Sequence, residues 1–252
     1  MYLNLYLKMN IDINCDVGEG IGNEAELFPF ISSCNLACGG HAGDETTMQA
    51  IVSLAKRHQV EIGAHPSYPD KSNFGRISMD LNLAELLETI QTQVANLVSV
   101  CEKEHVKLHH IKAHGALYND TAKGGPLALT FLKAIEEYKA ELYLYVPSAS
   151  FLAQMASEQG FKIKREAFGD RNYNEDLSLV SRKQSNAIIS EPSLVFQHLY
   201  SMVQNQQVRT VSGVLKTIVA DTYCIHGDTP NALQILMYLS EELPKKHIYL
   251  QK

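Results

Sequence analysis

The sequence predicts an α/β fold in which seven parallel strands close into an irregular (βα) barrel. The chain alternates short apolar runs with amphipathic helical patterns seven times, which is typical of parallel strands joined by helices. Its length of 252 residues and its hydrophobic content of 45% suit one barrel with one core. Polar, glycine-rich segments follow several of the apolar runs. Because the C-terminal ends of barrel strands meet at one mouth, these segments are expected to form a single polar site.

Each predicted strand is a short apolar run bounded by glycine, proline or charged residues. The predicted strands cover residues 11–15, 34–38, 60–64, 109–113, 142–146, 162–167 and 218–225. The segment from 168 to 190 does not follow this alternation. It is predicted to be a long functional loop that contains a small pair of strands, 177–180 and 187–189.

The helices between these strands are predicted from apolar residues spaced three and four apart. The first begins at Asp44, a preferred N-cap residue, and continues to residue 55. The clearest pattern runs over 83–105, and further helices are predicted at 122–138, 148–159, 191–204 and 229–243. No linker, repeat or low-complexity segment interrupts the chain. Residues 1–252 are therefore predicted to form one barrel domain.

The first nine residues are predicted to be a dispensable extension, with Met9 as the working start. Residues 1–8 lack the basic n-region and the small-residue cleavage site of a secretory signal. No apolar run reaches the ~18 residues that a membrane helix needs. We therefore expect a cytoplasmic protein without a membrane partner.

The charge balance argues against nucleic acid as a partner. The formal net charge is −6 and the pI is about 5.9, so the chain offers no basic stripe to a polyanion. The five cysteines are an odd number without zinc-type C-x-x-C pairs. We expect them to be reduced thiols of a cytosolic protein.

Five polar segments supply the candidate site residues. Asp16 and Glu19 leave the first strand among glycines, and a turn with solvated carboxylates is the alternative interpretation. Lys112 and His114 are two residues apart on a strand and therefore share a face, where an inward lysine is costly unless it is paired. The segments are Asn14-Cys-Asp-Val-Gly-Glu-Gly20, Cys38-Gly-Gly-His-Ala-Gly-Asp44, Gly63-Ala-His-Pro-Ser-Tyr68, Lys112-Ala-His-Gly-Ala-Leu-Tyr-Asn119 and Cys224-Ile-His-Gly-Asp-Thr-Pro230.

Several of these side chains also have a plain structural interpretation. Asp44 and Asp228 can cap the helices that follow them. Pro66 can hold His65 in a purely structural position. Asp170 and the arginine after it can form a surface ion pair. The occurrence of all five segments together, rather than any single residue, favours an enzyme.

Read in order along the chain, these segments resemble the LamB/YcsF family. The similarity runs from Asn10 to the last helix and includes further short motifs. These motifs are Asn35-Leu-Ala-Cys-Gly-Gly-His-Ala-Gly-Asp44, Phe74-Gly-Arg76, Ala167-Phe-Gly-Asp-Arg171 and Leu179-Val-Ser-Arg182. The resemblance implies an irregular βα barrel of the glycoside hydrolase/deacetylase type. It also implies cleavage of 5-oxo-L-proline to L-glutamate, coupled to ATP hydrolysis, in a complex with 5-oxoprolinase subunits B and C.

The implied reaction opens a stable five-membered lactam, which phosphorylation of the lactam oxygen would make more electrophilic. The chain has no G-x-x-x-x-G-K-[ST] phosphate loop and no kinase signature. ATP, the expected co-substrate, is therefore predicted to bind at an unrecognised site or mainly to the partner subunits.

The predicted roles follow from the chemistry of each side chain. Asp16 or His65 deprotonates the attacking water, Lys112 and Arg171 stabilise the developing anion, and His114 protonates the leaving ring nitrogen. The predicted substrate-binding residues are Glu19, His41, Asn119, Asp170, His226 and Asp228.

Two alternatives stay open from the sequence. One is a metal-dependent deacetylase or related hydrolase on the same barrel, with Asp16, His41 and His65 as ligands around an activated water. The other is a non-catalytic subunit that binds a small acid. The segment 70–79 is a candidate lid or contact loop, with a plain surface loop as its alternative.

Overall fold

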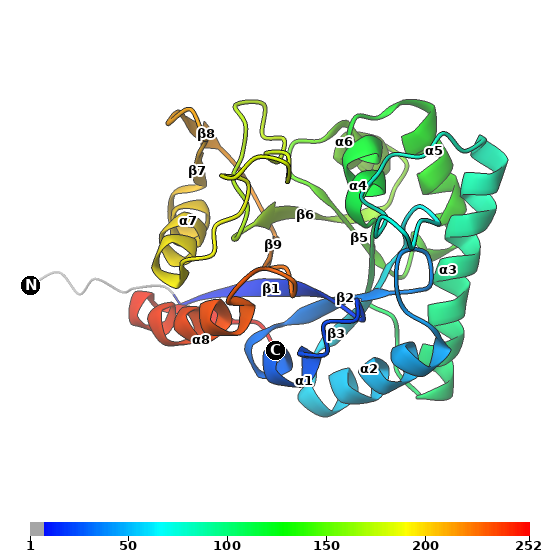
Figure 1. The fold of residues 1–252 in the computed structure, drawn as a ribbon, viewed down its shortest axis with the longest axis horizontal. Helices are drawn as coiled ribbons and strands as arrows, with labels where there is room; N and C mark the ends of the chain where they lie inside the picture. Colours follow the sequence, from blue (N-terminus) through cyan, green and yellow to red (C-terminus); the bar gives the residue numbers. More distant parts are fainter. Residues whose placement is uncertain (1–7) are drawn as a thin grey trace, which may run out of the picture.

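Seven parallel strands close into a barrel in the computed structural model, which describes residues 8–252 (Figure 1). The barrel closes because β1 pairs with β2 on one side and with β9 on the other, while β9 also pairs with β6. The predicted seven-stranded barrel is thereby confirmed. The strands are β1 Met9–Val17, β2 Ser33–Ala37, β3 Glu61–His65, β4 His110–Lys112, β5 Tyr143–Pro147, β6 Lys162–Phe168 and β9 Thr222–Cys224.

Helices surround the barrel on the outside (Figure 1). The predicted cap at Asp44 is present, since its Oδ1 accepts a hydrogen bond of 2.7 Å from the backbone N–H of Thr47. None of the described helices is long and apolar enough to span a membrane. The helices are α1 Glu24–Leu27, α2 Glu45–His58, α3 Leu83–Lys103, α4 Gly115–Ala122, α5 Gly125–Ala134, α6 Phe151–Glu158, α7 Pro192–Asn205 and α8 Ala232–Glu242.

The interior of the barrel is polar, whereas the layer between barrel and helices is apolar. Strand β1 shows the division, because its residues alternate between the two sides. Ile13 and Cys15 belong to the apolar core, while Asp12, Asn14 and Asp16 form hydrogen bonds across the barrel. All five cysteines of the chain are buried and free. The barrel interior therefore contains polar side chains, many of which form hydrogen bonds with one another.

The helix predicted over 122–138 is confirmed only in part, as the shorter α5, Gly125–Ala134. A separate helix that was not predicted, α4 Gly115–Ala122, comes before it. Gly124 and Gly125 separate them with φ values of +78° and +77°, a conformation that glycine adopts without strain. Pro126 then occupies the first turn of α5, a position that tolerates a missing N–H.

The strand predicted over 218–225 is also shorter than expected. Only β9, Thr222–Cys224, belongs to the barrel, and the preceding residues form a separate hairpin of β7 Gln207–Arg209 and β8 Leu215–Thr217. A turn at Gly213, with φ of +87°, reverses the chain between the two strands. A further short strand that was not predicted, β10 Ile248–Leu250, pairs with the first residues of β1.

The loop between β6 and α7 contains no pairing between 177–180 and 187–189, contrary to the prediction. Instead, Tyr173 bridges to Leu179 and Arg171 bridges to Ile188. The side chain of Arg171 accounts for this arrangement. Its Nε donates to the Ala187 carbonyl at 3.2 Å and its Nη2 to the Val180 carbonyl at 2.6 Å, so both segments are held against the same arginine.

The predicted extension covers residues 1–9, of which residues 1–7 lie outside the described part of the chain. Met9 belongs to the fold, because it is the first residue of β1 and its N–H donates to the His247 carbonyl at 3.0 Å. Whether the rest of the predicted extension is dispensable stays a prediction.

We expect Gly63→Ala to lower the free energy of unfolding by about 1–3 kcal/mol, because a Cβ at this position would overlap the imidazole of His110. Urea denaturation would measure the change. In Gly63→Ala/His110→Ala the ring is gone and the added methyl has room. The two changes should therefore be non-additive, and strict additivity would contradict the packing argument.

Candidate active site

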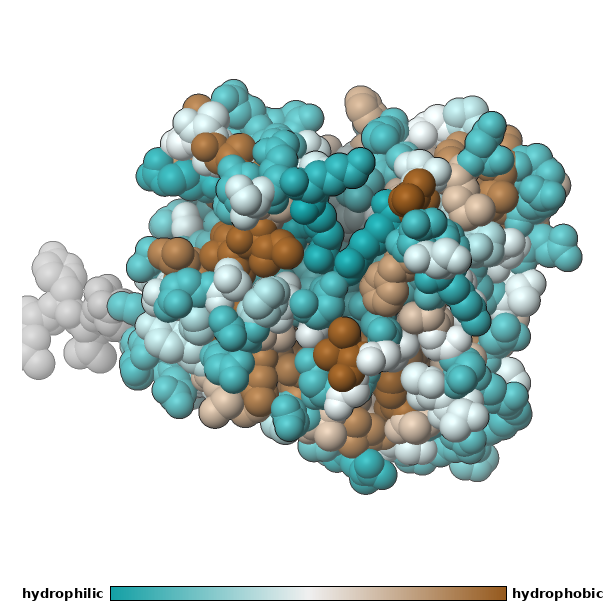
Figure 2. Space-filling view, in the orientation of Figure 1, coloured by the Kyte–Doolittle hydropathy of each residue, from teal (hydrophilic) through white to brown (hydrophobic). Residues whose placement is uncertain are grey.

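A cavity of about 970 Å³ opens at the C-terminal ends of the barrel strands. Its wall comes from the strand ends, the start of α4, the start of α6 and the loop between β6 and α7. Figure 2 shows a recess in this face with hydrophilic side chains around it. The position agrees with the expectation that polar segments distant in sequence meet at one mouth.

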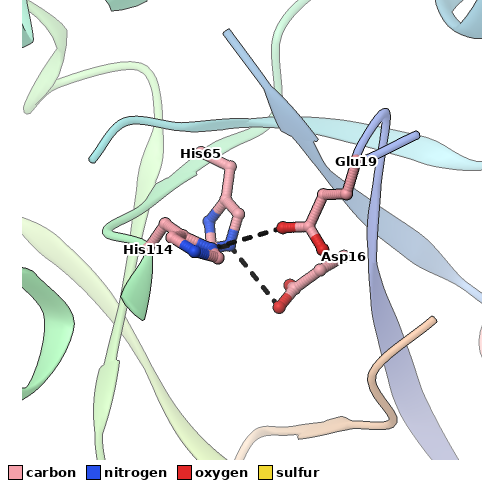
Figure 3. Close-up of side chains that lie close together, drawn as sticks. All are labelled: Asp16, Glu19, His65 and His114. Carbon is pink, nitrogen blue, oxygen red and sulfur yellow. Dashed lines mark hydrogen bonds and ion pairs between the residues drawn. The ribbon is translucent and has the colours of Figure 1, made fainter. Parts of the chain in front are cut away.

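Two carboxylates and two imidazoles converge at the inner end of this cavity (Figure 3). Asp16 comes from the end of β1 and Glu19 from the loop after it, while His65 ends β3 and His114 precedes α4. His65 Nε2 lies 3.0 Å from His114 Nδ1 and 3.5 Å from Asp16 Oδ2, and His114 Nδ1 lies 3.3 Å from Glu19 Oε1. All four residues are buried.

Backbone carbonyls fix the orientation of both rings. His65 Nδ1 donates to the Lys112 carbonyl at 2.8 Å, and His114 Nε2 donates to the Phe74 carbonyl at 2.9 Å. A neutral imidazole has only one N–H, so the inner nitrogens of these rings are acceptors when both are neutral. They face each other beside two carboxylates. Such a cluster of acceptors must hold a shared proton or a bound cation.

His41 supports Glu19 from behind the cluster. Its Nε2 lies 3.0 Å from Glu19 Oε1, and its ring stacks on His114 with centroids 3.6 Å apart. Burial would raise the pKa of Glu19, but hydrogen bonds from His114 and His41 outweigh it and hold the pKa well below its usual value. Burial lowers the pKa of His41 to about 4. Glu19 is therefore an anion to which neutral His41 donates through Nε2, whereas His114 can donate to it only when its Nδ1 carries the shared proton.

Lys112, on β4, joins two carboxylates that come from two other strands of the barrel. Its Nζ lies 2.9 Å from Asp16 Oδ1 on β1 and 2.9 Å from Glu166 Oε1 on β6. Burial opposes the charged ammonium, but the neighbouring Asp16 carboxylate raises the pKa of Lys112. Burial likewise opposes the charge on Asp16, which Lys112 and His65 hold at a pKa well below normal. Lys112 and Asp16 therefore carry full charge near neutral pH.

A chain of hydrogen bonds inside the barrel orients Asp16. Asn35 Nδ2 donates to Asp16 Oδ1 at 2.7 Å and to Asn14 Oδ1 at 2.8 Å. Asn35 Oδ1 must then accept, and it does so from His110 Nε2 at 2.8 Å. Because burial lowers the pKa of His110, this ring stays neutral and its Nδ1 accepts from His109 Nδ1 at 3.0 Å. Each amide and imidazole in the chain thus has one defined orientation.

His226 lies beside Asp16 on the cavity wall, since the ligand atoms of Asp16, Cys224 and His226 lie within 4.8 Å of one another. Its Nδ1 lies 3.0 Å from both carboxylate oxygens of Asp170, and its backbone N–H donates to the same group at 2.9 Å. Its ring stacks on Phe168. Asp170 is fully buried and does not line the cavity, so it orients His226 and is too deep to touch a ligand in this arrangement.

The remaining predicted residues, all in the described part of the chain, form no hydrogen bond or ion pair with the cluster of four. Asn119 lines the cavity on α4, where its Nδ2 donates to the Gly115 carbonyl. Arg171 lines the wall formed by the loop after β6. Asp228 is at the rim, where it pairs with Arg76 and with Arg182. The segment 70–79 is no plain surface loop, because Phe74 packs on His114.

The model of the LamB/YcsF family matches residues 11–252. The chain belongs to the LamB/YcsF family. A member from Staphylococcus epidermidis, named as the A subunit of 5-oxoprolinase, is 38% identical over 250 residues, which cover 97% of this chain and 99% of that protein. The family assignment from the sequence is therefore confirmed.

Solved structures agree with this fold. The lactam utilization protein from Thermus thermophilus superposes with a TM-score of 0.90 at 32% identity, covering 96% of this chain and 99% of that one. A putative cellobiose-phosphate cleavage protein from Enterococcus faecalis has a TM-score of 0.59 at 14% identity, covering 98% of both chains. The second likeness concerns the fold alone.

The cluster of four could hold a divalent metal ion. Asp16, Glu19, His65 and His114 each offer one ligand atom, and these atoms lie within 4.8 Å of one another. Both imidazoles already donate their outer N–H to a carbonyl, which is the usual support of metal-bound histidine. The ligand set predicted from the sequence included His41, which is not in this group because its Nε2 is engaged by Glu19.

Sequence reasoning missed Glu166, Asn35 and Tyr118. Glu166 and Tyr118 line the cavity, and Asn35 holds Asp16. The missed signal for Glu166 is alternation along β6, where a buried carboxylate two residues before Phe168 must face the barrel interior. Asn35 is visible in the sequence only as part of a family motif. Tyr118 lies on α4, a helix that the predicted elements do not include.

We expect the free energy of unfolding to fall as the pH drops from 6.5 to 4. Burial lowers the pKa of His198 to about 4, so the unfolded chain binds a proton in this window and the folded chain does not. One such group contributes about 1.4 kcal/mol per pH unit. His198→Phe removes this titrating group, which lies outside the cluster of four. In urea denaturation from pH 4 to 7, the unfolding free energy of this variant should depend less steeply on pH, by up to that amount. Parallel pH curves for the two proteins would contradict this.

Proposed function

We propose that this protein is the A subunit of a 5-oxoprolinase, which hydrolyses 5-oxo-L-proline to L-glutamate with hydrolysis of ATP. The observation that carries the proposal is 38% identity, over nearly the whole chain, to a protein named as the A subunit of 5-oxoprolinase. The buried cluster of carboxylates, imidazoles and one lysine at the barrel mouth supplies groups suited to opening a lactam.

The geometry supports distinct roles for these groups. The water attacks the lactam carbonyl carbon and gives its proton to Asp16 or His65. The carbon–nitrogen bond then breaks, and the ring nitrogen takes a proton from His114, which can receive one through its 3.0 Å contact with His65. Lys112 stabilises the developing anion, with Asp16 and Glu166 as its neighbours. We place Arg171 outside this step, on the cavity wall.

ATP coupling is proposed to depend on partner subunits B and C. The chain has no recognisable phosphate-binding loop, and its cavity ends in carboxylates at the inner end, which repel a triphosphate. Transfer of the terminal phosphoryl group to the lactam oxygen would release ADP and make the ring carbon a better electrophile. After water adds and the ring opens, this group is left as an acyl phosphate on the side-chain carboxyl group, and a second water releases it as inorganic phosphate. ATP is therefore proposed to bind mainly to the partner subunits.

Reconstitution tests this function directly. The purified chain alone should show little ATP hydrolysis, and addition of subunits B and C should yield glutamate and ADP only when 5-oxo-L-proline is present. Rapid cleavage by the isolated chain without nucleotide would reject the proposal. So would a reconstituted complex that hydrolyses ATP equally fast with and without the lactam.

A metal-dependent hydrolase is the second candidate, favoured by the four converging acceptors around His65 and His114. A bound divalent ion would activate water and polarise a carbonyl. Metal analysis of protein purified without added metal decides between the two. One equivalent of metal, lost in His65→Gln, would favour this candidate, and metal-free protein with full activity would reject it.

A further inference from the structure

The cavity has two ends of opposite charge. At the inner end, three carboxylates face one ammonium group, that of Lys112. The outer wall carries more cationic than acidic side chains. These outer charged residues are Arg76, Lys123, Arg171, Asp176, Arg182 and Lys183. The volume of about 970 Å³ lies near the upper end of the roughly 300–1,000 Å³ usual for drug-sized ligands, so a small lactam leaves this wall room to bind a second group.

Arg171 is a buried cation without a carboxylate partner. It is only 5% exposed, and its two hydrogen bonds go to the Val180 and Ala187 carbonyls. Among the described residues, no carboxylate forms an ion pair with it. Burial, together with the charge of Arg182, lowers the pKa of Arg171 to about 10. Buried charges are normally paired, so this guanidinium lacks the anion that its position requires.

Arg182 is only partly neutralised. Its nearest carboxylate oxygen, Asp228 Oδ2, is 3.7 Å from Nη1, and the same oxygen already pairs with Arg76. Two guanidinium groups therefore share one carboxylate at the rim. Arg182 and Arg171 both line the cavity on the loop after β6, and each keeps N–H groups available to a ligand.

We propose that Arg171 and Arg182 form an oxyanion-binding subsite on the outer wall of the cavity. The guanidinium fork matches a carboxylate or a phosphoryl group. Lys112 is not part of this subsite, because it lies at the inner end between Asp16 and Glu166, where its proposed role is to stabilise the anion that develops at the lactam carbonyl. The carbonyls of residues 180 and 187 hold the Arg171 side chain in place, so little rotamer freedom is lost on binding.

The inference rests on the proposed function and makes it more specific. A lactam acid held here by its carboxylate would direct its ring toward the imidazoles at the inner end. A phosphoryl group presented by a partner subunit is also an oxyanion and would bind the same two arginines. The two sources can be separated by ligands that carry only one of the groups.

Calorimetric titration of the full chain, alone and with subunits B and C, tests the subsite with three ligands. These are 5-oxo-L-proline, 2-pyrrolidinone, which has the lactam without the carboxylate, and inorganic phosphate. Arg182→Gln and Arg171→Lys are compared with Arg165→Gln, a matched change at an arginine that pairs with Asp221 outside the cavity.

If the carboxylate is the occupant, Arg182→Gln and Arg171→Lys should weaken 5-oxo-L-proline binding about 10-fold and leave 2-pyrrolidinone binding unchanged. If a phosphoryl group is the occupant, phosphate binding falls by that factor while 5-oxo-L-proline is unaffected. Arg165→Gln should bind all three ligands like the unaltered protein.

Unchanged binding of both anions in both variants would overturn the subsite. Equal losses for 5-oxo-L-proline and 2-pyrrolidinone would overturn it as well, because the arginines would then act on the fold and not on the anion. Arginine-dependent phosphate binding without any lactam binding would keep the subsite and reject the proposed function. No binding of any ligand, with or without the partners, would reject both.

Discussion

Lys112→Met should lower the free energy of unfolding by about 3–5 kcal/mol and reduce turnover at least ~100-fold. The ammonium group is 2% exposed and lies between the carboxylates of Asp16 and Glu166, at 2.9 Å from each. Without the ammonium group, the two buried carboxylates lose their shared cation and repel each other. Urea denaturation and glutamate release by the reconstituted complex measure the two effects.

The double variant Lys112→Met/Glu166→Gln separates stability from chemistry. Removal of one unpaired carboxylate should restore part of the lost stability, because less buried charge is left without a partner. Turnover should not return. If the free energy of unfolding of Lys112→Met is within about 1 kcal/mol of that of the unaltered protein, Lys112 contributes little net stability to the barrel.

Asp16→Asn should reduce turnover at least ~100-fold while changing the fold little. An amide keeps the shape of the side chain, and its oxygen can still accept the hydrogen bonds from Asn35 and Lys112. It cannot take a proton from water or stabilise a protonated His65. Steady-state glutamate formation, with thermal unfolding as a check on folding, measures the loss.

The matched control is Asp44→Asn, in which the amide can still cap α2 because asparagine is an equally good N-cap. It should leave turnover and stability close to the unaltered values. Retention of more than a tenth of the activity in Asp16→Asn would remove this carboxylate from the role of base and favour His65.

The local sequence pattern predicted the barrel, because the predicted strands are short apolar runs and the predicted helices have apolar residues spaced three and four apart. The predicted strands were wrong in segments whose pairing depends on residues that are distant in sequence but close in space. The strand predicted over 218–225 is only Thr222–Cys224, because the chain just before it turns at Gly213 and pairs with β7. The segments around Val180 and Ala187 pair with residues near Arg171 because that side chain bonds to both.

The candidate site was predicted only in part, because the sequence shows local motifs but not contacts between distant residues. Asp16, His65, Lys112 and His114 stand in polar segments at or directly after strand ends, and parallel strands bring such segments to one mouth. Glu166 and Asn35 lie inside strands, where sequence does not reveal which neighbours they face.

The sequence by itself determined the fold class, the family and most of the side chains that meet at the mouth, because strand alternation and the order of motifs are local properties of the chain. Only the tertiary structure decided which of these groups touch. It put Glu19 and His114, and not His41, beside Asp16 and His65 as candidate metal ligands, joined Lys112 to Glu166 inside the barrel, and left Arg171 buried without a carboxylate partner among the described residues. Those distances arise from the closure of β9 onto β1, which no short segment of the sequence encodes.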